Sequence, residues 1–116
     1  MQERCGKHAE QLFEKFYGNG VNDDKNGLMM SRYNCHYNRK LNKCFMLLIS
    51  TGSLKEKTKD NLGFYTDKGL WDINENKQFG QFFSGTKTKV VQCEVTGKTC
   101  HSESEWDSWI KPYMEE

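Results

Sequence analysis

The stretch KCFMLLIST, residues 43–51, gives the strongest strand signal in the sequence, because it contains the longest apolar run of the chain, residues 44–49. The run is short, and Thr51, Gly52 and Ser53 end it, which is typical of a buried central strand. It is far shorter than the ~20 apolar residues of a membrane-spanning helix. The sequence therefore predicts a central strand here and no transmembrane segment in the chain.

Two amphipathic helices are expected near the ends of the chain. In residues 3–17 the apolar side chains recur on one helical face, and the Gly-Asn-Gly sequence at 18–20 ends the helix. The last segment begins with a capping box of the form S-x-x-E, made by Ser102 and Glu105. The apolar face of this second helix carries Trp106, Trp109, Ile110 and Tyr113.

The segments between the helices carry weaker signals. Residues 18–34 are rich in Gly, Asn and Asp in their first half and resemble a loop, and residues 54–61 predict a charged, exposed connector. Residues 63–73 predict one bent strand or a hairpin around an Asp-Lys-Gly turn, and residues 74–87 a loop or short helix. Residues 88–100 predict a strand followed by a tight turn. We therefore expect a single domain, residues 1–116, of the α+β class, with an antiparallel sheet of three or four strands packed with the two helices.

Composition and charge exclude several classes of protein. Three Trp, five Tyr and seven Phe predict a packed core, and a single proline argues against disorder. The formal charge is +1, from 17 basic and 16 acidic residues that are mixed along the chain. This balance gives no electrostatic basis for binding nucleic acid or an anionic membrane.

Five cysteines in 116 residues are typical of a small exported domain that disulfides stabilise. The alternative is a zinc site, but the gaps between successive cysteines contain no C-x2-C or C-x4-C pair. The histidines are scattered singly, as His8, His36 and His101. We therefore expect disulfides, no metal site and no cofactor.

Turn geometry predicts the first disulfide. If Thr96 and Gly97 form a hairpin turn, Cys93 lies directly opposite Cys100. The Cα atoms of such a pair are ~4.5–5.5 Å apart, within the range that a disulfide requires.

The second predicted disulfide joins Cys5 to Cys44. Cys5 opens the apolar face of the first helix, and Cys44 begins the central strand. Cys35 could compete for Cys44, but it lies in the polar approach to the strand. We expect it to be a free thiol.

The stretch NCHYNRKLNKC, residues 34–44, is the candidate functional site, because it gathers hydrogen-bonding groups and an aromatic ring in an expected loop. A small thiol-dependent enzyme or redox protein would instead use Cys35 with His36, and the imidazole would have to reach the thiolate. Adjacent residues on a strand point to opposite faces, so adjacency does not supply that geometry. In a purely structural interpretation, Asn38 and Asn42 satisfy backbone groups of the loop. A binding site would use His36, Tyr37, Asn38, Arg39 and Lys40.

Four segments together resemble a group of small bacterial proteins of unknown function. In that group a leader precedes an exported or lipoprotein-type mature domain. The resemblance covers most of the chain from Cys5 onward, and it implies a periplasmic or cell-surface location but no activity. It also implies that Cys35 is an extra thiol, because the group usually has a small polar residue there. The segments are CHYNRKLNKCFMLL (35–48), LWDINENKQFGQF (70–82), CEVTGKTC (93–100) and SESEWDSWIKPYMEE (102–116).

The opening MQERCGKHAEQ has no apolar segment of the signal-peptide type. It suits either a cytosolic protein or a mature chain whose leader has been removed. Together with the cysteine count, this leads us to expect an extracytoplasmic domain without its leader. We expect it to be non-enzymatic and to bind an unknown protein or small ligand, with the thiol enzyme as the alternative.

Overall fold

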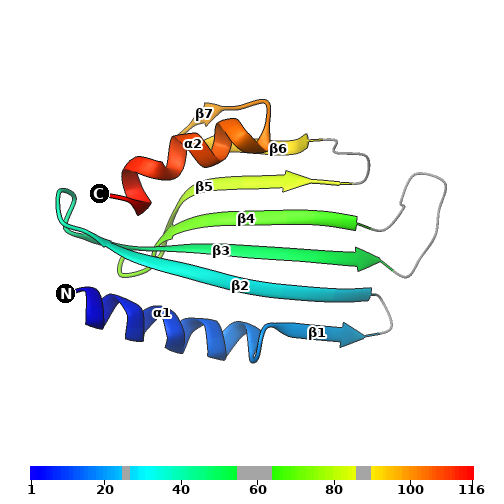
Figure 1. Cartoon of the computed structure of the whole chain (residues 1–116), viewed down its shortest axis with the longest axis horizontal. Helices are drawn as coiled ribbons and strands as arrows, with labels where there is room; N and C mark the ends of the chain where they lie inside the picture. The colour runs from blue at the N-terminus through cyan, green and yellow to red at the C-terminus, as the bar shows by residue number, and fades with distance from the viewer. Residues whose placement is uncertain (25–26, 55–63, 86–89) are drawn as a thin grey trace.

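The chain forms a helix, an antiparallel meander and a second helix (Figure 1). The computed structural model describes residues 1–24, 27–54, 64–85 and 90–116. Seven described strands lie in one sheet in the order of the sequence, each antiparallel to its neighbours. The elements are α1 (Gln2–Tyr17), β1 (Val21–Asp24), β2 (Gly27–Asn38), β3 (Lys43–Leu54), β4 (Phe64–Asp72), β5 (Lys77–Ser84), β6 (Val90–Val95), β7 (Lys98–Thr99) and α2 (Glu103–Met114).

The prediction of three or four strands is wrong, because polar segments also form strands in this sheet. The expected loop at 18–34 contains β1 and most of β2. All twelve residues of β2 pair with β3, and the backbone groups that point toward β3 form the ladder whatever the side chains are. The ambiguous segment at 74–87 contains β5, which pairs with β4 on one side and β6 on the other. The predicted connector lies almost wholly within residues 55–63, outside the described residues.

Of the two alternatives for residues 63–73, the single strand is confirmed and the hairpin turn at Asp67, Lys68 and Gly69 is wrong, because β4 runs through these residues. Their side chains have partners on both faces of the sheet. The Lys68 ammonium lies 2.8 Å from Glu103 Oε2 and 3.0 Å from Asp107 Oδ1, both on α2. Polar residues in the middle of a strand therefore tie β4 to its neighbours here.

The two helices cover opposite faces of the sheet, and alternate residues of β3 show this. Residues that pair directly across antiparallel strands share a face, so the register extends each face to the neighbouring strands. Phe45 and Leu47 belong to the core that packs against α2, and we call this side of the sheet the α2 face. Cys44 and Met46 belong to the core that packs against α1, and we call that side the α1 face.

The core of the α2 face is closed. Trp106 is 0% exposed and donates from Nε1 to the backbone oxygen of Glu94 at 2.9 Å. One half of the expected capping box is present, because Ser102 Oγ accepts from the Glu105 backbone N–H at 3.1 Å, whereas Glu105 Oε1 accepts from the His101 backbone N–H at 2.9 Å. Besides Trp106, the buried residues of this core are Phe45, Leu70, Phe82, Cys93, Val95, Cys100 and Ile110.

The core of the α1 face is smaller and includes the first turns of α1. Its fully buried members come from α1, β3 and the turn after β4, and α1 contributes one aromatic side chain, Phe13. The Phe13 ring lies 4.8 Å from the Tyr33 ring on β2 and 5.4 Å from the Tyr17 ring, measured between centroids. The buried residues of this core are Cys5, Ala9, Phe13, Cys44, Met46 and Ile73.

One disulfide lies in each core, and the two pairs are those that the sequence predicts. Cys5 and Cys44 join α1 to β3 with their Cα atoms 5.4 Å apart. Cys93 and Cys100 join the two sides of the hairpin formed by β6 and β7, with their Cα atoms 5.0 Å apart. Cys35 is the free cysteine.

Candidate functional site

The residues expected to form a site, 36–40, do not form one pocket. They occupy the end of β2 and the turn to β3, where the sequence predicts a loop. Cys35 pairs with Met46 on the α1 face, whereas His36 pairs with Phe45 on the α2 face. The thiol and the imidazole therefore point to opposite sides of the sheet and cannot act as a nucleophile and base on one substrate.

Asn38 has a structural role in this stretch. Its side chain is 1% exposed, and its Nδ2 donates to the backbone oxygens of Pro112 at 2.9 Å and Tyr113 at 3.2 Å. Its Oδ1 accepts from the Leu41 backbone N–H at 3.0 Å. The side chain thereby joins the C-terminal turn of α2 to the turn between β2 and β3.

The other residues of the stretch are dispersed. Tyr37 lies beside the start of α1, where its backbone N–H donates to Gln2 Oε1 at 2.7 Å, and its hydroxyl bonds to Asn42. Arg39 and Lys40 are exposed, and the Lys40 ammonium lies 3.2 Å from Glu116 Oε2. His36 Nε2 is buried without a hydrogen-bond partner among the described residues, on the face opposite Tyr37.

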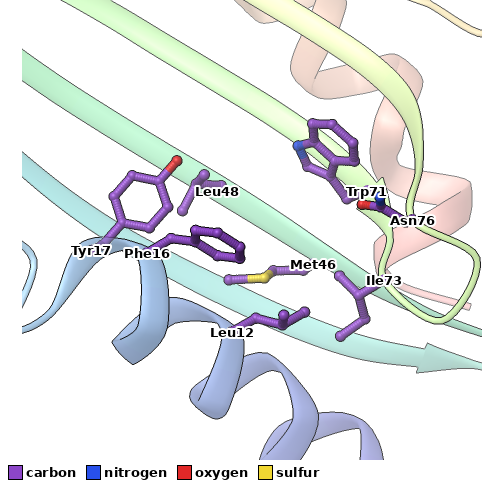
Figure 2. A pocket seen from close by; sticks show the side chains of 8 residues that line it. All are labelled: Leu12, Phe16, Tyr17, Met46, Leu48, Trp71, Ile73 and Asn76. Atoms are coloured by element: carbon purple, nitrogen blue, oxygen red, sulfur yellow. The ribbon is translucent and has the colours of Figure 1, made fainter.

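A groove of about 600 Å³ lies on the α1 face, between α1 and β4 (Figure 2). One wall is the last two turns of α1, because Tyr17 and Phe16 lean over β3 toward the sheet. Phe16 is 67% exposed, although it continues the apolar face of its helix. The lining residues are Leu12, Phe16, Tyr17, Met46, Leu48, Trp71, Ile73 and Asn76.

A row of polar side chains lies next to Trp71 on the same face, outside the residues that line the groove. The register places Gln78 opposite Trp71, and Gln81 opposite Gly69, all on the α1 face. The Gln78 amide donates to Gln81 Oε1, and the Gln81 amide donates to Asp67 Oδ1. We call Asp67, Gln78 and Gln81 the polar row. The α1 face therefore has an apolar groove next to α1 and, beside it across Trp71, a row of hydrogen-bonding side chains on β4 and β5.

Charges of both signs lie near the groove: the Asp67 carboxylate acts on Tyr17, and the Lys15 ammonium lies 5.4 Å from the centroid of the Phe16 ring at the mouth. Burial and the negative charge of Asp67 together raise the pKa of Tyr17, so its phenol stays protonated well above neutral pH. Among the described residues of β2 to β6 that face α1, none is Lys or Arg, whereas Asp67 and Glu94 are acidic. The floor of the groove is therefore unfavourable for anions.

The free thiol has the wrong environment for a nucleophile. Cys35 is partly buried on the α1 face, with its Sγ beside Gly6 of α1. Burial raises the pKa of the Cys35 thiol, which lowers the fraction of reactive thiolate at neutral pH. Within the described part of the chain, no three His, Cys, Asp or Glu side chains gather as a metal site.

A second hollow of about 630 Å³ lies on the α2 face near the start of α2. Its lining combines Phe64, Tyr65, Phe82 and Val90 with polar residues that include His101, Ser102, Glu103 and Ser104. Polar residues make up a larger part of this lining than of the groove's, so the groove is the better candidate for binding an organic ligand.

Sequence reasoning missed the groove for an identifiable reason. Phe16 and Trp71 lie in apolar patterns and resemble core residues, and the polar row falls in segments without a clear strand signal. The only usable signal was the width of the apolar stripe on residues 3–17, which extends to Phe16 beyond what one packed face needs.

Among the described residues, no helix is long and apolar enough to cross a membrane. Comparisons of the chain with protein-family models, with curated proteins and with solved structures found no match.

Proposed function

We propose that this chain is an extracytoplasmic ligand-binding domain and that it binds its ligand in the groove between α1 and β4. The observation that carries the proposal is Phe16. A phenyl ring that is 67% exposed, on a helix whose other apolar residues are packed, leaves apolar surface uncovered at the mouth of a groove. A ligand that covers this ring would remove that surface from water.

The two disulfides support the extracytoplasmic part of the proposal. Disulfides persist in oxidising compartments and are rare in cytosolic proteins. The Cys5–Cys44 disulfide also holds the walls of the groove in place, because it fixes α1 to β3. The groove is therefore preformed, which lowers the entropy lost on binding. The non-enzymatic part rests on Cys35 and His36 lying on opposite faces.

A neutral apolar dye tests the groove without knowledge of the natural ligand. N-phenyl-1-naphthylamine carries no charge, so the carboxylate of Asp67 does not repel it, and it fluoresces when it leaves water. We expect it to bind the parent protein, and we expect Phe16→Ser to weaken that binding about tenfold, because the mouth of the groove loses its largest apolar side chain.

Phe64→Ser is the matched control. Phe64 is 72% exposed, similar to Phe16, but it lies at the edge of other hollows and outside the groove. It should leave dye binding unchanged. Dye binding that depends on Phe64 and not on Phe16 would move the site to the other face, and no dye binding to the parent would overturn the proposal.

A further inference from the structure

Resting on the proposed function, we propose that the groove's ligand is a neutral saccharide chain. One sugar ring stacks on Trp71, and its hydroxyl groups bond to the polar row. The inference follows from three features of the α1 face: two aromatic rings that lie over glycines, a row of side chains with unused hydrogen-bonding capacity, and the absence of cationic side chains from the described strand positions of this face.

The indole of Trp71 is held flat against the sheet. A Cβ added at Gly69 would lie 2.9 Å from Trp71 Nε1 and 3.4 Å from its Cδ1, so the ring occupies the space above a residue without a side chain. In Figure 2 the indole is seen nearly face-on over the ribbon of its strand. One ring face therefore contacts the backbone, and the other faces the groove. A pyranose presents a face of C–H groups that packs on such a ring.

A second aromatic ring, that of Tyr65, lies on the same face and on the same strand, six residues before Trp71 along β4. A Cβ added at Gly52 would clash with the ring of Tyr65, so this ring also lies over a glycine. Tyr65 and Phe83 stack with their centroids 5.9 Å apart. Asp67 lies between Tyr65 and Trp71 along β4, on the same face. Two ring surfaces with a carboxylate between them suit a chain of at least two sugar units.

The polar row has capacity left for hydroxyl groups. Gln81 uses its amide on Asp67 Oδ1 and on the backbone oxygen of Phe82, and its Oε1 accepts from Gln78. Asp67 Oδ2, Gln78 Oε1 and one Gln78 N–H then have no partner among the described residues. These groups are both acceptors and donors, and they lie beside the Trp71 ring. Sugar hydroxyls radiate around the ring edge and need both kinds of partner.

Charge separates a saccharide from the other ligands that an aromatic groove could hold. An anionic lipid or organic acid would approach Asp67 and Glu94 without meeting a Lys or Arg on the described strand positions of this face. A cationic ligand would pair with the Asp67 carboxylate of the polar row, but it would leave the hydrogen-bonding capacity of Gln78 and Gln81 unused. A neutral polyhydroxyl ligand uses every member of the row.

Saturation-transfer difference NMR with maltose, lactose, cellobiose and N,N′-diacetylchitobiose tests the proposal, since it detects dissociation constants of about 1 mM. We expect at least one disaccharide to bind the parent protein. Trp71→Ala should abolish that binding, and Gln81→Leu, which has nearly the same volume, should weaken it about tenfold by removing the centre of the row. Phe64→Ser should leave it unchanged.

N-phenyl-1-naphthylamine separates this proposal from the one on which it rests. Gln81→Leu should keep dye binding, because Gln81 does not line the apolar wall. Dye binding also shows whether a variant has a folded groove. Dye binding by a parent that binds no disaccharide would overturn the saccharide proposal and leave the groove as a binding site. Disaccharide binding that survives Trp71→Ala would also overturn the saccharide proposal. Binding of the cation phenethylammonium in place of a disaccharide would overturn it as well. A parent that binds neither dye nor sugar would overturn both proposals.

Discussion

The two faces of the sheet have the same components, but their tryptophans are covered to different extents. Each has one helix and one disulfide, yet α2 buries Trp106 completely in the core of its face, whereas the α1 face leaves Trp71 lining an open groove. The cause is where each helix meets the sheet. α2 packs across the strands and is tied to β4 by Lys68, whereas the Cys5–Cys44 disulfide fixes α1 over β3, so β4 and β5 stay uncovered on that side.

The same residue type therefore stabilises the core on one face and, in the function we propose, binds a ligand on the other. Trp106 has its indole N–H bonded to a backbone oxygen and its ring among Phe82 and other core side chains. Trp71 lies over a glycine, beside glutamines that have hydrogen-bonding capacity left. Whether a helix covers the tryptophan therefore determines which of the two roles its ring has.

Replacing the two tryptophans should give the largest contrast between the faces. We expect Trp106→Ala to lower the free energy of unfolding by ~3–5 kcal/mol, as truncation of a buried aromatic residue does. Trp71→Ala should cost only ~1 kcal/mol, because its ring is partly exposed and lines the groove, so less apolar surface leaves the core. Chemical denaturation of both variants measures this difference. Equal losses would mean that the groove is closed in solution.

The disulfides should differ in the same direction as their loop lengths. Cys5–Cys44 spans 39 residues in sequence and Cys93–Cys100 spans 7. The chain-entropy model then gives losses of ~4 kcal/mol for the double replacement of Cys5 and Cys44 by Ala, and ~2.5 kcal/mol for the same replacement of Cys93 and Cys100. Denaturation midpoints under non-reducing conditions provide the measurement.

The Cys5–Cys44 variant should also lose groove binding, because α1 is then held to β3 by packing alone. The variant without Cys93–Cys100 is its control and should bind the dye as the parent does. If both variants keep dye binding, α1 is positioned by its apolar face and the disulfide is not needed to form the groove.

Part of this fold could be predicted from the sequence, and the missing part has a physical cause. The helices at both ends carry strong signals, because apolar periodicity and a capping box are local features. The pairing of Cys93 with Cys100 follows from one turn. β2 and β5 give no such signal, because their polar side chains are tolerated once β3, β4 and β6 pair with their backbones.

The site was harder to predict than the fold. The expected binding stretch concentrates polar residues in sequence, but the strand sends His36 to one face and Cys35 and Tyr37 to the other. The groove instead combines residues from α1, β3 and β4 that are far apart in sequence. Its polar row depends on the register between β4 and β5, including the irregularity between Leu70 and Trp71. Composition does not determine a register.

A smaller effect should separate the starts of the two helices. Ser102 caps α2 with its side chain, whereas Met1, the N-cap residue of α1, makes no side-chain hydrogen bond to its helix. We expect Ser102→Ala to cost ~1 kcal/mol, as removal of an N-cap does. Met1→Ser, measured in the same way, should not destabilise the protein. A neutral Ser102→Ala would mean that the packing of Trp106 alone determines where α2 begins.

The smallest effect concerns the free thiol of the α1 face. Burial raises the pKa of Cys35, so the native thiol holds its proton at pH values where the thiol of an unfolded chain, with a pKa of about 8.5, has begun to lose it. The native state then binds more protons than the unfolded state, and this thiol makes stability fall as the pH rises above that value. We expect iodoacetamide to alkylate Cys35 in native protein several-fold more slowly than in urea at pH 8, with the native rate still rising above pH 9. Cys35→Ser is the control, because under non-reducing conditions it should take up no label. Rapid alkylation of native protein at pH 6 would require a depressed pKa and would restore the thiol enzyme that the opposite orientations of Cys35 and His36 argue against.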